Sequence, residues 1–524
     1  MTNPEKSLEE ILNALFEKVG NLDSPKEKKE LERLKSEPRF ERLVEVLLEE
    51  GQRKDRGRRS EVGRQRSEGK STNSKLEAQS PLPGISSQPL TTNSEPRTLN
   101  SELPDPIRNL AVIYSKEHER HYSDQFKWES PGRVEAILTT LKSEGFFGAT
   151  KTTLLKGRRA TIEELQLVHD LKYIEFIRDT SKKGTTNLPR STYLCPGTWD
   201  AALYAAGGAL MAGEVIENQR SEVRDRRSEV GGRRSEIRSP AIRNPQSAIR
   251  NLYDAVFVLT RPPGHHAMAD MYGGFCIFNN SAILAERLKR KGRVMILNWD
   301  VHASNGTKHI FYDTPEVLTV SIHQDPKGFF PNEGFVEEIG RDPGRGYSIN
   351  IPMPAGCGDE EYLYVFDTVV NPICEQYRPR YIIIECGFDA HHKDPLGGQG
   401  LTSTGYYELG RRLLTLTSLG SSESKPKATN HELRTPIIFT LEGGYNPEIV
   451  GILTHTLLSS LFGMANPKPK KYAGEPRGKN DKLSYGLIRD LKYHKQKGGK
   501  RGKNIRDVIK ELKYHLRDHW TIED

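Results

Sequence analysis

Four short apolar runs between Ala255 and Tyr445 set the expected fold. Each run is rich in β-branched or aromatic residues and stops at a glycine, a proline or a charged residue, a pattern typical of buried parallel strands. The runs are AVFVLT (255–260), VMILNW (294–299), YIIIEC (381–386) and IIFTLE (437–442). We therefore expect a central, mainly parallel sheet within an α/β domain.

A polar cluster follows each of these four runs. The clusters are RPPGHH, DVH, GFDAH and GGYN, in chain order. In an open α/β sheet, ligands bind at the carboxyl ends of the strands. We therefore expect six side chains to converge there: His265, His266, Asp300, His302, Asp389 and Tyr445.

Three of these residues form a candidate metal site. Asp300 and His302 stand two apart at one strand end, and Asp389 follows another strand. Three protein ligands leave room for water, which is the arrangement that a catalytic metal needs. Nitrogen and oxygen donors without a thiolate suit Zn²⁺, and also Fe²⁺ or Co²⁺.

The other three residues suit proton transfer. His265 and His266 follow a stiff Pro-Pro-Gly segment, and histidine is the natural proton carrier near neutral pH. Tyr445 follows two glycines that permit a tight turn, and its phenol is a candidate donor to an oxyanion.

Composition divides the 524 residues into a globular part and loose material. Only 35% of residues are hydrophobic, and the deficit lies in Arg-, Ser- and Glu-rich segments that repeat an RRSEV motif. The expected organisation is a helical extension (1–50), a low-complexity linker (51–104), a catalytic domain (105–465) with a disordered insertion (217–250) and a polar loop (418–436), and a basic tail with a terminal amphipathic helix (466–524). We expect the helix before the insertion to end near Ile216, and the stripe of the terminal helix to dock on its own domain.

Charge and cysteine usage bear on the expected partners and cellular compartment of the protein. The net charge of +8 concentrates in residues 467–503, but no recognised nucleic-acid-binding motif accompanies this tract, so we interpret it as a solvated tail and expect no requirement for nucleic acid. The five cysteines are scattered without a CxxC pair, which indicates a reducing compartment. Neither a secretory signal nor a membrane-spanning run is visible, so we expect a soluble, cytoplasmic protein.

Together the motifs resemble the histone deacetylase family, in its class II and bacterial deacetylase-like branch. The matching segments are RPPGHHA, GFCIFNN, NWDVHASNGT, GFDAHHKDPLGG and LEGGYN, with weaker matches at ESPGRV, LCPGTWDAALYAAGGAL and GFFPNEG. The resemblance covers roughly 110–465 without the insertions. It implies the arginase/deacetylase fold, a three-layer sandwich in which a sheet of about eight strands lies between helices.

The resemblance also implies roles for individual residues. Asp300, His302 and Asp389 would hold Zn²⁺, and His266 would activate the bound water with electrostatic help from His265. Tyr445 would polarise the amide carbonyl. The remaining residues would form the substrate tunnel: Phe275 and Phe330 as its walls, Gly274 and Ser191 as acceptors of the substrate N–H, Leu396 near its mouth and Arg133 at its inner end.

Residues 298–306, which include the expected ligands Asp300 and His302 and are called the metal loop below, depart from the family pattern. Asn298 stands where the family has an aspartate facing the first histidine, so His265 should hold its proton less tightly. Asn305 is ordinary for class II. Family members also bind a structural K⁺ through backbone carbonyls near Asp300 and His302, and Ala303 and Ser304 replace a His-Gly step beside that candidate cation site.

The leading hypothesis is a zinc-dependent deacetylase acting on N-acetyl-lysine in proteins or peptides. The alternative substrates are acetylpolyamines or other small acyl-amines, but Leu396 stands where polyamine-selective relatives often place an acidic residue. An alternative of another class is a non-catalytic acyl-lysine-binding scaffold, because Asn298 replaces the usual aspartate. An arginase-like manganese enzyme is disfavoured, since two metals need more aspartates. A homo-oligomer is compatible with the sequence.

Overall fold

The computed structural model describes residues 105–231, 253–419, 434–467 and 504–522. The expected helical extension (1–50) and linker (51–104) lie outside the described residues, as do most of the polar loop and the basic tract. The domain boundaries given above therefore stay predictions.

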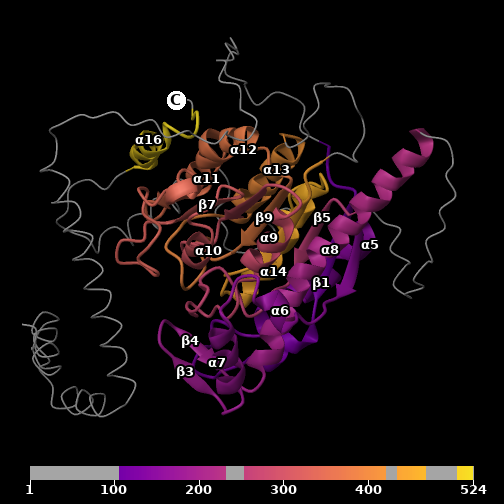
Figure 1. The fold of residues 1–524 in the computed structure, drawn as a ribbon, viewed down its shortest axis with the longest axis vertical. Coiled ribbons are helices and arrows are strands. Elements are labelled where there is room, and N and C mark those ends of the chain that lie inside the picture. The colour runs from indigo at the N-terminus through magenta and orange to yellow at the C-terminus, as the bar shows by residue number, and fades with distance from the viewer. Residues whose placement is uncertain (1–104, 232–252, 420–433, 468–503, 523–524) are drawn as a thin grey trace, which may run out of the picture. The chain divides into compact units, whose positions relative to one another are not determined.

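A parallel sheet of eight strands forms the centre of the fold (Figure 1). Its spatial order is β2-β1-β5-β10-β9-β6-β7-β8, and every neighbouring pair is parallel. The strands are β1 (Asn109–Tyr114), β2 (Lys151–Lys156), β5 (Ala255–Val258), β6 (Val294–Asn298), β7 (Val317–Gln324), β8 (Ser348–Met353), β9 (Tyr381–Cys386) and β10 (Ile437–Leu441). A separate antiparallel pair joins β3 (Thr186–Leu188) to β4 (Thr192–Leu194).

The four apolar runs of the sequence are four consecutive strands at the centre of this sheet. They are β5, β10, β9 and β6 in spatial order, and all their residues are buried. Their carboxyl ends lie at one edge of the sheet because the strands are parallel. The expected fold class is thus confirmed, and the polar clusters that follow these strands start side by side.

Helices cover both faces of the sheet. Within β5, Phe257 packs into the core beneath α4, α13 and α14, whereas Val256 packs into the core beneath α8 and α9. This alternation follows from the two-residue period of a strand. The five helices are α4 (Gly132–Ser143), α8 (Thr198–Gly231), α9 (Asn280–Lys289), α13 (Ser403–Leu419) and α14 (Pro447–Leu461).

Further helices complete the described part of the chain. They are η1 (Lys116–Arg120), α5 (Phe146–Ala149), α6 (Ile162–Leu165), α7 (Leu171–Ser181), α10 (Asn305–Ile310), η2 (Asp342–Gly344), α11 (Asp359–Val365), η3 (Phe366–Val370), α12 (Asn371–Tyr377) and α16 (Ile505–Leu516).

Helix α8 continues beyond its expected end. It runs to Gly231 instead of ending near Ile216, so the first part of the expected insertion is helical (Figure 1). Two physical features explain the difference. Arg and Glu are good helix formers, and the repeated segment contains neither proline nor an internal glycine before residue 231. Residues 232–252 lie outside the described residues.

The terminal helix α16 docks on the domain that contains the eight-stranded sheet, as its apolar stripe predicts. Three of its four buried side chains belong to the same core as the sheet, namely Ile509, Leu512 and Leu516, and the fourth is Val508. Beyond the helix, Trp520 Nε1 donates a hydrogen bond of 2.6 Å to the Gly346 carbonyl. The helix is therefore part of the packed domain.

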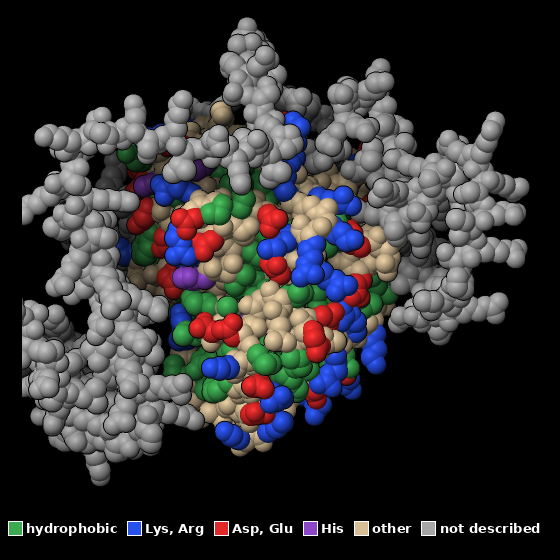
Figure 2. Space-filling view, viewed as in Figure 1, with side chains coloured by type: hydrophobic (Ala, Val, Ile, Leu, Met, Phe, Trp, Pro, Cys, Tyr) green, Lys and Arg blue, Asp and Glu red, His purple; other side chains and the backbone are tan. Residues whose placement is uncertain are grey.

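The surface carries both signs of charge. On the face drawn in Figure 2, basic side chains alternate with acidic ones instead of forming one field. Among the described helices, none combines the length and the apolar character that a membrane crossing requires.

Candidate active site and metal centre

Asp300, His302 and Asp389 converge at the carboxyl ends of β6 and β9. Their candidate ligand atoms all lie within 4.8 Å of one another, and the group is buried. His302 Nδ1 lies 3.1 Å from Asp300 Oδ1 and 3.2 Å from Asp389 Oδ2. The structure thus brings together the three residues that the sequence singles out as metal ligands.

Backbone amides orient the two carboxylates. The Val301 N–H donates to Asp389 Oδ1 over 2.9 Å, and the Gly443 N–H donates to Asp300 Oδ2 over 2.7 Å. Gly443 must be a glycine here, because a Cβ would lie 2.0 Å from Asp389 Oδ2 and 2.5 Å from Asp300 Oδ2. The turn after β10 therefore packs directly against both carboxylates.

The electrostatics of this cluster favour a bound cation. Burial and the charge of Asp300 raise the pKa of Asp389 to about 7. Burial alone would lower the pKa of His302, but its contacts with Asp300 and Asp389 outweigh burial and raise that pKa to about 10. Burial likewise opposes the charge of Asp300, yet His265 and His302 hold its pKa well below the usual value. Two buried carboxylates thus lie against one imidazole, and a divalent cation would take the place of the proton on that ring.

One orphaned atom supports a metal at this position. Asp389 Oδ2 is buried and accepts no hydrogen bond from the described residues. Buried polar atoms are normally satisfied, so an unpaired carboxylate oxygen beside two other donors fits an ion. The oxygen and nitrogen donor set also fits a borderline divalent metal.

The two neighbouring histidines are each held by an amide side chain. His265 Nδ1 lies 3.3 Å from Asn298 Oδ1, and His266 Nδ1 lies 2.8 Å from Asn305 Oδ1. Burial lowers the pKa of His265, and burial together with the charges of His265 and His302 holds the pKa of His266 well below its usual value. Both rings are therefore neutral near pH 7, as a proton acceptor must be.

Tyr445 lies beside the cluster as a protonated phenol. Burial raises its pKa well above the usual value, although the Arg133 guanidinium, 4.7 Å above its ring, acts in the opposite direction. The Tyr445 N–H donates to Asp394 Oδ2 over 2.6 Å. Arg133 in turn donates to the Gly444 carbonyl over 2.7 Å and also to the Glu442 carbonyl. These contacts fix the turn that presents the phenol.

Aromatic rings surround the candidate reaction centre. The Phe330 ring centre lies 4.9 Å from that of His266, and the Phe275 ring centre lies 5.5 Å from that of Tyr445. Gly274 packs against His266 and Phe330, since a Cβ at this position would lie 2.3 Å from His266 Cδ2 and 2.8 Å from the Phe330 ring. The structure therefore brings the expected wall residues to the centre.

The two outermost predicted residues lie at the edge of this region. Ser191 is exposed, and its carbonyl accepts a hydrogen bond of 3.2 Å from the Phe275 N–H. Leu396 is half-buried, and its N–H donates to Asp394 Oδ1 over 2.9 Å. Their roles toward a substrate stay predictions.

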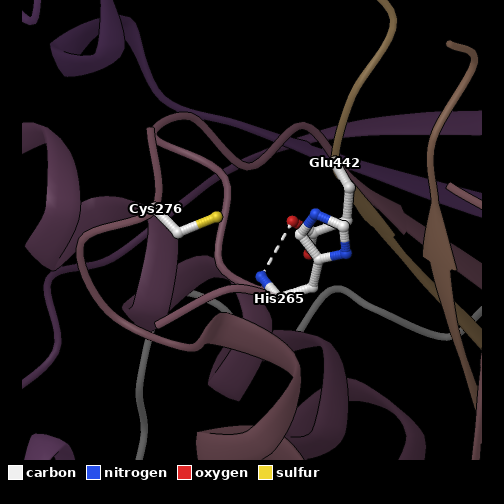
Figure 3. Close-up of side chains that lie close together, drawn as sticks. All are labelled: His265, Cys276 and Glu442. Atoms are coloured by element: carbon white, nitrogen blue, oxygen red, sulfur yellow. Dashed lines mark hydrogen bonds between the residues drawn. The ribbon is translucent and has the colours of Figure 1, made fainter. Parts of the chain in front are cut away.

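A second buried group of potential ligands lies next to the first. His265, Cys276 and Glu442 have candidate atoms close together (Figure 3). However, Glu442 Oε2 already accepts hydrogen bonds from the backbone N–H groups of Gly264 and His265, over 2.7 and 3.1 Å. Burial raises the pKa of the Cys276 thiol well above its usual value, so the sulfur keeps its proton. We interpret this group as a structural one, in which hydrogen bonds to Glu442 connect the turn after β10 to the turn after β5.

Sequence reasoning missed several residues that support the site. Phe329 stacks on His302 at 5.0 Å between ring centres. Glu385 accepts hydrogen bonds from Ser304 and Thr307 beneath the metal loop, and burial raises its pKa to about 7. Glu442 and Asp394 orient the two flanking turns, and all three acids were visible as strand-end or loop carboxylates within the quoted motifs.

The sequence pattern described as the histone deacetylase domain matches residues 127–461. That match covers more than half of the chain. The chain belongs to the histone deacetylase family. This family generally uses a metal ion, in agreement with the buried group of Asp300, His302 and Asp389.

Two archaeal relatives of this histone deacetylase family member carry the name probable deacetylase. The protein of Archaeoglobus fulgidus is 33% identical over 361 residues, which cover 68% of this chain and 86% of that protein. The protein of Methanothermobacter thermautotrophicus is 32% identical over 357 residues, which cover 68% and 91%. The crystal structure of the HDA15 HD domain is similar with a TM-score of 0.56 and 27% identity, and it covers 77% of this chain and 98% of its own.

Proposed function

We propose that this protein is a zinc-dependent deacetylase that hydrolyses the amide of N-acetyl-lysine in proteins or peptides. The observation that carries the proposal is the convergence of three metal-type donors with two neutral histidines and one buried phenol. This set contains one group for each task of amide hydrolysis.

Asp300, His302 and Asp389 would hold the ion through two carboxylate oxygens and His302 Nδ1. When bound, a divalent ion with three protein ligands supplies a polarised water of lowered pKa. Zn²⁺ suits these donors best, and Fe²⁺ and Co²⁺ suit them as alternatives.

His266 is the proposed general base. Asn305 Nδ2 donates to Glu333 over 3.4 Å, so its Oδ1 faces His266 and must accept from Nδ1–H. The Nε2 atom is therefore the one free to take a proton. It removes the proton of the attacking water and returns a proton to the departing amine. His265, 3.9 Å away between ring centres, assists electrostatically.

Tyr445 is the proposed oxyanion donor. Because its pKa is raised, the phenol keeps its proton at neutral pH and donates to the carbonyl oxygen as negative charge develops there. Its turn is held rigidly through Asp394 and Arg133, so little reorganisation is needed during the reaction.

The acyl-lysine chain is proposed to enter between Phe275 and Phe330. The two half-buried rings offer apolar walls to the four methylenes of lysine. The Gly274 carbonyl and the Ser191 hydroxyl are the proposed acceptors of the substrate N–H. Arg133 closes the inner end beneath Tyr445.

The scaffold alternative depends on Asn298 disabling the histidine pair. Asn298 Oδ1 still faces His265 Nδ1 at 3.3 Å, which supports catalysis over mere binding. The acetylpolyamine alternative depends on the group at position 396. An uncharged, half-buried leucine gives no attraction to the second amine of a polyamine, which supports acyl-lysine.

A substrate panel tests the proposal. We expect the zinc-loaded protein to hydrolyse acetyl-lysine peptides with a higher kcat/KM than acetylated spermidine or putrescine. Leu396→Glu should move the preference toward acetylpolyamines, whereas the uncharged control Leu396→Gln should not. Turnover of acetylpolyamines alone would replace the proposed substrate with the alternative. Binding of peptides without any turnover would support the scaffold.

A further inference from the structure

The side-chain amide of Asn298 occupies a point where three oxygens converge. Asn298 is buried at the end of β6. Its Nδ2 lies 3.4 Å from the Asp300 carbonyl, 3.1 Å from the His302 carbonyl and 3.0 Å from Ser321 Oγ. Its Oδ1 lies on the other side, 3.3 Å from His265 Nδ1.

The partners of Asn298 fix the orientation of its amide. Backbone carbonyl oxygens only accept hydrogen bonds, so the NH₂ group must face Asp300 and His302. The Oδ1 atom then faces His265 and only accepts. His265 must therefore carry its proton on Nδ1, which leaves Nε2 unprotonated on the side of the metal cluster, 3.8 Å from Asp300 Oδ1.

The hydroxyl of Ser321 is oriented independently. His323 Nε2 lies 2.8 Å from the Gly334 carbonyl and must donate to it, so His323 Nδ1 is an acceptor. Ser321 lies 2.8 Å from that Nδ1 and donates its proton there. The lone pairs of Ser321 therefore face Asn298 Nδ2 and the Ser304 N–H. All three oxygens around Nδ2 are acceptors.

A cluster of uncharged oxygens around one point is how proteins coordinate a hard cation. The family resemblance implies a potassium ion at backbone carbonyls of this loop. Here the nitrogen of Asn298 lies within hydrogen-bond distance of those carbonyls, so its N–H groups face the oxygens that an ion would need as ligands. Asparagine also supplies no negative charge. The residues present do not fit K⁺ at this position.

We infer that Asn298 replaces a bound monovalent cation: the two hydrogens of its NH₂ group are shared among the Asp300 carbonyl, the His302 carbonyl and Ser321 Oγ, and the metal loop forms without K⁺. The same amide holds His265 in the Nδ1–H form. Asn298 is thus a positioning residue that connects the loop containing Gly334 to the histidine pair through Ser321 and His323.

The inference makes a specific prediction for Asn298→Asp. A carboxylate has no hydrogens, so four oxygens would face one another without a donor, at a cost that a cation removes. We expect this variant to acquire K⁺-dependent stability. Asn305→Asp is the matched control, because it makes the same change opposite the other histidine, where the amide nitrogen faces the Glu333 carboxylate instead of backbone carbonyls.

Thermal unfolding of the full chain tests the inference in KCl and in tetramethylammonium chloride at equal ionic strength. We expect Asn298→Asp to unfold several degrees higher in K⁺ than in the large cation, beyond any difference seen in the wild type and in Asn305→Asp. A K⁺ response of Asn298→Asp equal to that of the wild type would overturn the inference. This measurement reads stability, so it is independent of whether the protein is a deacetylase.

If the variant does not fold, anomalous diffraction from crystals of the wild-type protein soaked in thallium(I), a substitute for K⁺, tests whether a monovalent cation binds at these oxygens. In the wild-type protein we expect no anomalous peak between Asp300 O, His302 O and Ser321 Oγ. A peak at that point would contradict the inference directly.

Discussion

At the scale of single residues, amide side chains replace charge around the candidate catalytic histidines. Asn298 and Asn305 each accept a hydrogen bond from an imidazole, and neither brings the negative charge that a carboxylate would. The family resemblance implied that Asn298 would face His265, and in the structure its Oδ1 lies 3.3 Å from His265 Nδ1. The sequence could not predict the other contacts of Asn298, because Ser321 and the two loop carbonyls reach it only after folding.

Asn298→Asp is expected to move the pH profile of catalysis. Burial lowers the pKa of His265 in the wild type, and a carboxylate in place of Asn298 would favour the imidazolium and raise that pKa. A raised pKa keeps His265 protonated to higher pH, so the acidic limb of kcat/KM should shift upward. The profile is to be measured in saturating K⁺ for both proteins. Identical pH profiles of kcat/KM for the wild type and Asn298→Asp would show that the residue at position 298 does not control the pKa of His265.

Tyr445→Phe is expected to lower kcat by about 10²–10³-fold, because it removes one preorganised donor to the oxyanion. The ring and its contact with Arg133 remain, so metal content and unfolding temperature should match the wild type. Single-turnover kinetics with an acetyl-lysine peptide measures the change. Wild-type activity without the phenol would show that another group stabilises the oxyanion.

At the scale of elements, the strands were predictable and the ends of the helices were not. Four strands can be recognised in the sequence as short apolar runs that are followed directly by polar residues, namely β5, β6, β9 and β10. The end of α8 has no such signal, because Arg, Glu and Ser serve equally well in an exposed helix and in a solvated loop.

The packing of α16 supplies a prediction at this scale. Leu512 is fully buried against the domain core, so Leu512→Ala should destabilise the protein by about 2–5 kcal/mol. Lys510→Ala on the exposed face of the same helix is the control and should change stability by less than about 0.5 kcal/mol. Urea unfolding of the full chain measures both. Equal midpoints for the two variants would mean that α16 contributes no core packing.

At the scale of the whole molecule, one edge of the sheet collects every candidate catalytic side chain. Parallel strands β5, β10, β9 and β6 are neighbours, so residues far apart in sequence meet at their carboxyl ends. The sequence predicted this convergence because each polar cluster follows a strand that was expected to belong to a parallel sheet. It could not predict the buried carboxylates Glu385 and Glu442 as supports, since their partners come from several different loops.

A metal bound across these strands should stabilise the entire domain. Binding to the folded state alone contributes about 4 kcal/mol at a ligand concentration of 1,000 times Kd. Chelation should therefore lower the unfolding temperature of the wild type by several degrees. Asp389→Asn should show no such response, whereas the exposed control Asp518→Asn should respond like the wild type. A chelator response preserved in Asp389→Asn would place the ion elsewhere.

We propose that Asp300, His302 and Asp389 hold one divalent ion that the hydrolysis of an acetylated amine requires. The decisive experiment measures turnover of an acetyl-lysine peptide before chelation, after chelation, and after one equivalent of Zn²⁺ is restored. We expect activity before chelation, its loss after chelation and its recovery with Zn²⁺. Full activity in the chelated, metal-free protein would contradict it.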